Sequence, residues 1–317
     1  MNILGFYVGN RSQNTLLMYL TILLTIFLVF LVHRHYVNNN NNRRHEGFDQ
    51  GERFVVRRNL EIYDAFTAQI YDKIYQPKST NQYIFDMVEK LTQSSQTKSV
   101  MLDVGSGTGD LLGYIHQKGY INSFGVDQSP GMVEMALQKY PSIQVKEADL
   151  QKPMTYDKQT FTHIFLTGNT VYHFQDKRTL FQNLYYWMIP NGYLVLHVVD
   201  RERFDPIPPC GKPVLVDSVQ SLVEERVTDT IIDFIDFQYK SSYDFTQATT
   251  KNAVLFQETF TDTNSHHVRM NELTLYMEPM DEIIYMAQSV GFLVHGRIDL
   301  KETTWDPYQY VFVLERT

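Results

Sequence analysis

The segment SVMLDVGSGTGD, at residues 99–110, constrains the fold of this chain more than any other. Its apolar run ends in glycines at alternate positions, Gly105, Gly107 and Gly109. An apolar run that leads into a glycine-rich turn is typical of a buried parallel strand followed by a helix. Glycines let the backbone turn sharply beside a ligand, and the free N–H groups at a helix start attract anions. The segment therefore predicts a ligand site at a strand–helix turn of an α/β fold.

The spacing of these glycines separates two kinds of cofactor. A dinucleotide-binding turn has the form G-x-G-x-x-G, whereas this chain has G-x-G-x-G, with Asp110 where the last glycine would fall. The segment resembles motif I of the class I S-adenosylmethionine-dependent methyltransferases, which is a hydrophobic strand and an acidic residue followed by G-x-G-x-G. The resemblance covers roughly residues 60–317 and implies S-adenosylmethionine as cofactor. The alternative is a glycine-rich turn of some other α/β protein.

The chain after this turn alternates predicted strands and helices, as the resemblance requires. Further strands are expected at 121–126, 143–145, 161–166, 193–199, 292–298 and 309–314. Together they imply a Rossmann-like, seven-stranded class I methyltransferase sheet whose last strand is antiparallel. Residues 200–275 break the alternation, and strand-like runs at 230–239, 253–260 and 267–277 predict an antiparallel β-rich lid inserted after the fifth strand.

Acidic residues at strand ends are candidates for holding the cofactor. Asp127 lies about twenty residues past the glycines, where a carboxylate accepts the hydroxyls of a ribose. The resemblance implies that Asp149 accepts the adenine amino group, although a solvated turn would look the same. It also places Tyr71 or Tyr75 on the methionine carboxylate, with core packing as the alternative. The full predicted cofactor set is Tyr71, Tyr75, Asp103, Gly105, Ser106, Gly107, Gly109, Asp127, Gln128, Met132, Asp149, Leu150 and Thr167.

The candidate catalytic residues are in the segment TGNTVYHF, at residues 167–174, which follows the predicted strand 161–166. Ligands of open α/β sheets bind outside the carboxyl ends of the strands, so this loop should face the transferred methyl group. We predict Asn169, Tyr172 and His173 there, with His173 as a possible proton acceptor from an amine or hydroxyl. A histidine that only packs or caps the next helix is the alternative. The Asp/Asn-Pro-Pro-Tyr sequence of enzymes that methylate base amines is absent.

The N-terminal part of the chain predicts a membrane anchor. Residues 1–14 form a short tail, and residues 15–32 carry no charge over 18 positions. A helix of that length spans about 27 Å, close to the roughly 30 Å hydrocarbon core of a bilayer. Arginines at 34, 43 and 44 follow the span, so the positive-inside rule places the bulk of the chain in the cytoplasm. An asparagine-rich linker is expected at 33–58, before the methyltransferase domain at 59–317.

Composition narrows the choice of function. The net charge of −8 and a pI near 5.7 argue against a general nucleic-acid binder. A single cysteine excludes an internal disulfide, and no metal-binding cluster is visible. We therefore predict a single-pass membrane methyltransferase acting on a small-molecule amine or hydroxyl. The alternatives are a lipid, quinone or protein acceptor, an inactive cofactor-binding assembly factor tethered to the membrane, and, most remotely, a dehydrogenase.

Overall fold

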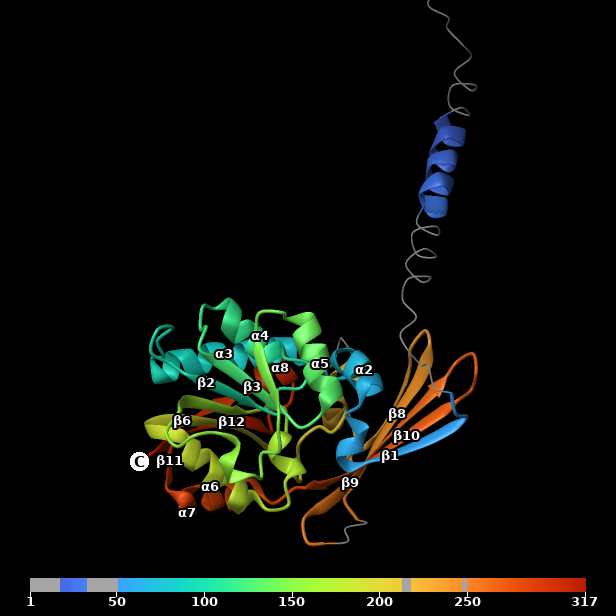
Figure 1. Cartoon of the computed structure of the whole chain (residues 1–317). Coiled ribbons are helices and arrows are strands. Elements are labelled where there is room, and N and C mark those ends of the chain that lie inside the picture. The colour runs from blue at the N-terminus through green and yellow to red at the C-terminus, as the bar shows by residue number, and fades with distance from the viewer. Residues whose placement is uncertain (1–17, 33–50, 213–217, 247–249) are drawn as a thin grey trace, which may run out of the picture. The chain divides into compact units, whose positions relative to one another are not determined.

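The computed structural model describes residues 18–32, 51–212, 218–246 and 250–317 (Figure 1). The chain divides into two compact units, Met1–Glu46 and Gly47–Thr317. All the elements named below, from β1 onward, belong to the second unit.

The membrane anchor predicted at residues 15–32 is not supported. Residues 18–32 are helical and exposed, while residues 15–17 lie outside the described part of the chain. Among the described residues, no helix has both the length and the apolar character needed to cross a membrane.

A seven-stranded sheet forms the centre of the second unit, in the order β11-β12-β6-β5-β2-β3-β4 (Figure 1). Its strands are β2 (Met101–Val104), β3 (Ser123–Asp127), β4 (Gln144–Glu147), β5 (Phe161–Leu166), β6 (Met188–Val199), β11 (Phe292–Asp299) and β12 (Gln309–Arg316). The five adjacent strands β6, β5, β2, β3 and β4 run parallel to one another, and β12 is antiparallel to both of its neighbours, β11 and β6. This order confirms the predicted Rossmann-like sheet with an antiparallel last strand.

Helices cover both faces of this sheet. They are α2 (Ala65–Tyr75), α3 (Lys78–Thr92), α4 (Asp110–Gln117), α5 (Pro130–Lys139), α6 (Lys177–Trp187), α7 (Met280–Val290) and the short α8 (Lys301–Thr304). Helices α3 and α4 lie on one face of the sheet, and α6 and α7 lie on the opposite face (Figure 1). Apolar side chains of α3 and α4 pack with β2 and β12 in one cluster, and those of α6 and α7 pack in another. The carboxyl ends of the parallel strands remain free for a ligand.

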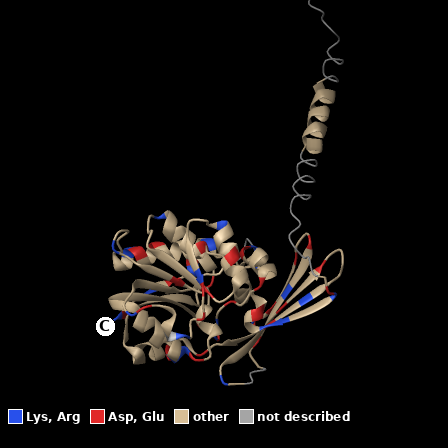
Figure 2. Ribbon diagram, viewed as in Figure 1, with Lys and Arg blue, Asp and Glu red and all other residues tan. Residues whose placement is uncertain are grey.

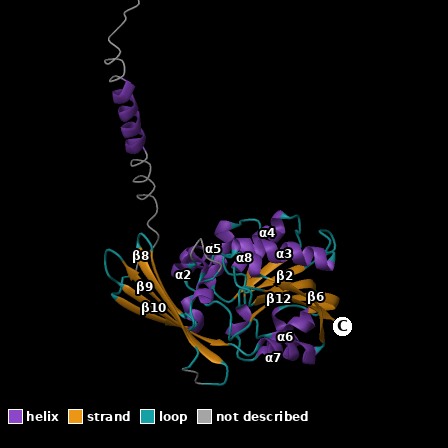
Figure 3. Cartoon of the chain, turned by 180° about the vertical axis from the view of Figure 1, so that it is seen from behind, coloured by secondary structure: helices purple, strands orange, loops and turns teal. Residues whose placement is uncertain are grey.

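A second sheet of five strands lies beside the helices, as the view from behind shows (Figure 3). Its strands, in spatial order, are β1 (Phe54–Arg58), β10 (Val268–Tyr276), β9 (Ala253–Asp262), β8 (Phe237–Asp244) and β7 (Asp229–Asp233). Alternate residues of β9 and β10 are buried, so the sheet has one inner face. On that face, Tyr239 and Phe260 pack against Ile70 and Ile74 of α2.

Two predicted boundaries need correction. Residues 54–58, assigned to the linker, form β1, which pairs in parallel with β10. The run at 230–239 is not one strand but the ends of two, because the chain reverses between Phe234 and Phe237 to make the β7–β8 hairpin. That turn contains no glycine or proline, the residues that usually announce a reversal.

The basic residues on the strands of the second sheet are largely paired (blue in Figure 2). Arg58 of β1 donates to Glu272 at 2.8 Å. Arg269 of β10, which is 5% exposed, forms an ion pair with Asp64 at 2.9 Å, just before α2. Since Asp64 also accepts from the backbone N–H of Thr67, it both caps α2 and joins that helix to the second sheet.

Candidate functional site

The glycine turn between β2 and α4 forms the floor of the site. Gly105, Gly107 and Gly109 all have positive φ angles, of 70°, 52° and 80°. A Cβ on Gly105 would lie 2.6 Å from Cγ2 of Thr170, so the loop after β5 can approach only a glycine there. At Gly109, a Cβ would come within 3.0 Å of Ala136 and Ile143, which shows that this glycine serves helix packing. The backbone of the turn can therefore be approached closely by neighbouring segments such as the loop after β5.

Asp127, the last residue of β3, is held rigidly beside this turn. Its Oδ2 accepts from the backbone N–H of Gly107 at 2.8 Å, and its Oδ1 accepts from that of Ser129 at 2.9 Å. Ser129 in turn caps α5 by accepting from the backbone N–H of Met132 at 3.0 Å. Burial raises the pKa of Asp127, against the effect of these backbone bonds. The carboxylate is therefore oriented before any ligand arrives.

Cavity A, of about 90 Å³, opens between Asp127 and the loop after β5. Eight predicted site residues line it: Tyr71, Gly105, Gly107, Asp127, Gln128, Met132, Leu150 and His173. Five further lining residues are Leu60, Tyr63, Gly168, Thr170 and Phe174. A carboxylate together with apolar Met132 and Leu150 in one wall suits a nucleoside, whose ribose is polar and whose base is flat.

Cavity B, of about 50 Å³, adjoins it above the glycine turn. Predicted residues in its wall are Tyr71, Asp103, Gly105, Ser106, Gly107 and Thr167. Asp103 is 3% exposed, and burial, followed by the charge of Asp127, raises its pKa to about 8. The buried hydroxyl of Ser106 has no hydrogen-bond partner among the described residues. Unpaired polar groups of this kind fit a ligand that carries a positive charge and hydrogen-bonding atoms.

Cavity C, of about 150 Å³, lies between the two sheets. Tyr71 and Gly168 line cavities A, B and C, so the three cavities adjoin one another at these two residues. Of the predicted residues, Tyr71, Tyr75 and Asn169 face cavity C. Tyr239, Tyr243 and Phe256 of the second sheet complete an aromatic wall.

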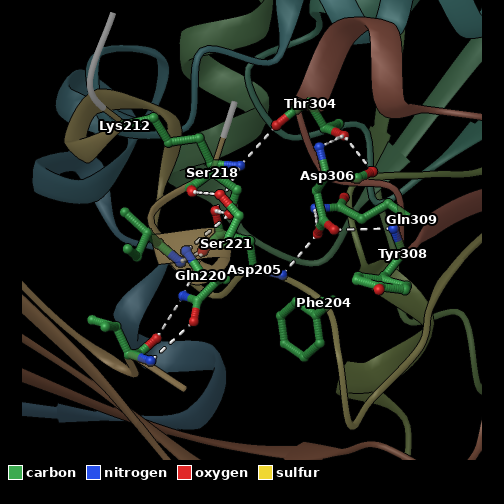
Figure 4. Close-up of polar contacts among 12 residues, drawn as sticks. Phe204, Asp205, Lys212, Ser218, Gln220, Ser221, Thr304, Asp306, Tyr308 and Gln309 are labelled. Carbon is green, nitrogen blue, oxygen red and sulfur yellow. Dashed lines mark hydrogen bonds and ion pairs between the residues drawn. The ribbon is translucent and has the colours of Figure 1, made fainter. Parts of the chain in front are cut away.

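The far wall of cavity C is a loop fixed by polar contacts (Figure 4). Asp205 accepts from Gln220 at 3.0 Å, and its backbone N–H donates to Asp306 at 2.8 Å. Lys212 donates to the carbonyl of Thr304 at 2.7 Å and lies 3.5 Å from the carboxylate of Asp205. The charge of Lys212 is therefore already compensated within this wall.

His173 lines cavity A rather than cavity C. Its Nε2 lies 2.6 Å from the hydroxyl of Tyr63, and its Nδ1 lies 3.3 Å from the carbonyl of Thr170. Burial lowers the pKa of His173 to about 4, so the ring is neutral at pH 7. A neutral ring with Nδ1 donating to that carbonyl must accept from Tyr63 at Nε2.

Three predicted residues line none of the three cavities. Tyr172 is 1% exposed, and its hydroxyl accepts from the backbone N–H of Val199 at 2.8 Å, which is a packing role. Gly109 serves helix packing, as described above. The carboxylate of Asp149 accepts from the backbone N–H of Gln151 at 3.0 Å in its own turn. Leu150, its neighbour, faces cavity A instead.

The sequence analysis missed several residues of the site. His197 of β6 is 4% exposed in the wall of cavity C, and neither ring nitrogen has a hydrogen-bond partner among the described residues. Burial lowers its pKa to about 4, although the side chain of Gln309 opposes that shift. Glu258 of β9 is 2% exposed behind Tyr75 and Tyr239. A glutamate between Phe256 and Phe260 at alternate positions of a strand was an available signal.

A comparison with known families decides the class of the site. Residues 102–196 match the family described as a methyltransferase domain. Over these residues the chain is similar to a methyltransferase domain, and this similarity supports S-adenosylmethionine as the cofactor. The match extends from β2 to β6 and includes the glycine turn, Asp127 and the loop after β5.

Curated relatives of the methyltransferase domain share part of its sequence. Phosphoethanolamine N-methyltransferase 3 of Arabidopsis thaliana is 31% identical over 112 residues, which are 34% of this chain and 22% of the relative. Demethylmenaquinone methyltransferase of Chlorobaculum tepidum is 31% identical over 103 residues, 32% of this chain and 42% of the relative. The matched region thus spans between about a fifth and two fifths of the length of these relatives.

Solved structures share the fold over a longer stretch. An S-adenosylmethionine-dependent methyltransferase from Clostridium acetobutylicum covers 78% of this chain and 97% of its own length, with a TM-score of 0.59 and 13% identity. A sugar N-methyltransferase from Streptoalloteichus covers 78% of this chain and 92% of its own length, with a TM-score of 0.53 and 17% identity. The methyltransferase fold therefore extends well beyond residues 102–196.

Proposed function

We propose that this protein transfers the methyl group of S-adenosylmethionine to a small-molecule amine or hydroxyl bound in cavity C. The observation that carries the proposal is that Tyr71 and Gly168 border all three cavities. A cofactor in cavities A and B would then meet an acceptor in cavity C at that point. S-adenosylmethionine, when bound, supplies an already activated methyl group, so the main task of the protein is alignment.

The residues of cavities A and B have distinct roles in this proposal. Asp127 accepts hydrogen bonds from the ribose hydroxyls, and Met132 and Leu150 pack against the adenine. Asp103 and Ser106 face the methionine end, where the buried carboxylate compensates positive charge. Asn169 follows Gly168 in the chain and faces cavity C, where it can bind the acceptor.

The relatives support a small acceptor. The names of the two relatives and of the sugar N-methyltransferase specify phosphoethanolamine, demethylmenaquinone and a sugar as acceptors of those proteins. Cavity C is enclosed by two sheets and has a volume of about 150 Å³, which suits a molecule of modest size. A quinone-type acceptor remains the second candidate, because a demethylmenaquinone methyltransferase is among the relatives.

The test uses the full chain. Calorimetric titration with S-adenosylmethionine and S-adenosylhomocysteine should show binding, and NADH, as control, should show none. Methyl transfer is then measured from labelled S-adenosylmethionine to phosphoethanolamine, amino sugars and demethylmenaquinone. Binding followed by transfer to one acceptor class supports the proposal, whereas binding without any transfer would favour an inactive cofactor-binding assembly factor.

The location of the protein is a separate proposal that rests on the sequence alone. The uncharged run at residues 15–32 and the arginines that follow it favour a membrane-attached chain with its catalytic part in the cytoplasm. Carbonate extraction of membranes should leave the full chain in the pellet. Release of the full chain into the supernatant would refute membrane insertion.

A further inference from the structure

The inner face of the second sheet buries a carboxylate that has no ion-pair partner among the described residues. Glu258 is 2% exposed, near the middle of β9. Its Oε1 accepts from the hydroxyls of Tyr75 at 2.7 Å and Tyr239 at 2.9 Å, and its Oε2 accepts from Nδ2 of Asn271 at 3.1 Å. These three donors are neutral. A buried carboxylate normally requires a positive charge close by.

The nearest basic side chain of the sheet is already engaged elsewhere. The guanidinium of Arg269 forms an ion pair with Asp64 at 2.9 Å and reaches Glu258 only through Asn271, to which it donates at 3.0 Å. On the opposite wall of cavity C, Lys212 is paired with Asp205. Burial raises the pKa of Glu258, and its three hydrogen bonds and the more distant charge of Arg269 only partly oppose that shift, so the carboxylate is incompletely compensated. Burial, followed by the charge of Glu258, raises the pKa values of Tyr75, Tyr239 and Tyr243, which line cavity C.

The wall of cavity C in front of Glu258 is aromatic. Tyr71 and Tyr75 of α2 lie with their ring centroids 4.8 Å apart. Tyr243 of β8 lies 4.5 Å from Phe256 of β9, and Tyr239 completes the group. Aromatic faces attract cations, and a desolvated site strengthens that attraction. Because the hydroxyl of Tyr75 donates to Glu258, its oxygen can accept a hydrogen bond from a ligand.

We propose that this tyrosine group and Glu258 form an ammonium-binding site, which selects an amine over a hydroxyl compound as the methyl acceptor. The inference rests on the proposed function and narrows its substrate class. Aliphatic amines are protonated at neutral pH, so the ammonium ion is the form that binds first. It must lose one proton, to solvent or to Glu258, whose pKa burial raises, before the nitrogen lone pair can form the bond to the methyl group that leaves the sulfonium. The amide oxygen of Asn169, in the same cavity wall, has no hydrogen-bond partner among the described residues and can bind the rest of the acceptor.

The test compares two probes that differ mainly in charge. Benzylamine and benzyl alcohol are titrated calorimetrically into the full chain saturated with S-adenosylhomocysteine. The wild-type protein should bind benzylamine at least about tenfold more tightly than benzyl alcohol. In Glu258→Gln this preference should disappear, while the affinity for S-adenosylhomocysteine stays unchanged. The control Glu272→Gln changes an acid on the neighbouring strand β10 that pairs with Arg58, so it should keep the preference.

A second variant guards against misfolding of Glu258→Gln. Tyr75→Phe removes one hydroxyl but keeps the ring, and it should weaken benzylamine binding several-fold without affecting benzyl alcohol. Equal binding of both probes by the wild-type protein, or a preference that survives in Glu258→Gln and Tyr75→Phe, would overturn the inference. Failure of the proposed function looks different, because it would appear as no binding of S-adenosylhomocysteine and no methyl transfer to any acceptor.

Discussion

The hydroxyl of Tyr63 lies 2.6 Å from Nε2 of His173 and joins the segment before α2 to the loop after β5. Both residues line cavity A, where their side chains contact each other. Burial raises the pKa of Tyr63 and lowers that of His173 to about 4, so both side chains are neutral at pH 7. The bond therefore closes the cavity without adding charge.

We expect Tyr63 and His173 to act as a unit. Tyr63→Phe and His173→Gln each remove the same hydrogen bond, and each should lower kcat/KM about tenfold. The double variant should be no worse than either single variant, because only one interaction is lost. Steady-state methyl transfer measures this. The control Tyr185→Phe removes a hydroxyl bonded to Thr317, away from the cavities, and should change nothing; additive losses would contradict the coupling.

Cofactor affinity should depend on pH through Asp103. In the free protein its pKa is raised to about 8, so the carboxyl is mostly protonated at pH 7. A positively charged cofactor favours the ionised form, so its binding should release a proton and tighten by up to about tenfold per pH unit until about pH 8. Calorimetric titration in buffers of different ionisation enthalpy measures the number of protons released on cofactor binding. Asp103→Asn should abolish the dependence, and a wild-type affinity that is constant from pH 6 to 8 would exclude this role.

Asp103 should also make the stability of the cofactor-free protein depend on pH, but this stability should fall as the pH rises, whereas cofactor affinity should increase. Because the folded pKa lies above the ordinary value of 3.8, the folded state binds the extra proton between about pH 4 and 8. The contribution of Asp103 to the free energy of unfolding should therefore fall as the pH rises through that window. Urea unfolding of the wild-type protein and Asp103→Asn at several pH values would show whether the two curves diverge in this direction.

Asp127 should be essential for cofactor binding. Asp127→Asn keeps the size of the side chain but removes the charge that accepts the ribose hydroxyls, and we expect S-adenosylmethionine affinity to fall about 10- to 100-fold. Glu147→Gln is a matched control, since Glu147 pairs in register with Asp127 at the end of β4 but lines none of the three cavities. Similar losses in both variants would indicate a general effect of charge at this edge of the sheet.

Gly105→Ala should damage cofactor binding as well as stability. Both Gly105 and Gly119 have positive φ angles, of 70° and 93°, so alanine at either position should cost about 1 kcal/mol. Only at Gly105 does the new Cβ clash with Thr170, which lines cavities A and B. We therefore expect Gly119→Ala to lower Tm while keeping the affinity for S-adenosylmethionine, and Gly105→Ala to lower both Tm and that affinity. Equal affinities in the two variants would argue against a cofactor-binding role for the turn at Gly105.

The sequence predicted the parts of the fold that depend on local pattern. Gly105, Gly107 and Asp127 lie as expected because a glycine turn and a strand-end acid are encoded within about twenty residues. Glu258 was missed because its environment is formed by α2 and β8, which are distant in the chain. Asp149 lies outside the cavities because a local turn, closed by its bond to Gln151, determines where the carboxylate points.

The strand β1 escaped prediction for a similar reason. Its sequence, FVVRR, is short and follows a polar stretch, so no local periodicity marks it. Only the pairing with β10 makes it a strand, and that partner lies far along the chain. Long-range pairing of this kind leaves almost no trace in a single sequence.

The pairing of β1 with β10 also bears on how the chain folds during synthesis. Arg58 and Glu272, which bond across these strands, are 214 residues apart in the sequence. The first strand of the domain must therefore wait, unpaired, until nearly all of the chain has left the ribosome. An unpaired strand is prone to associate with other chains. Chaperone dependence in the cell should thus be set by this one late contact, and slow refolding should follow from its high contact order.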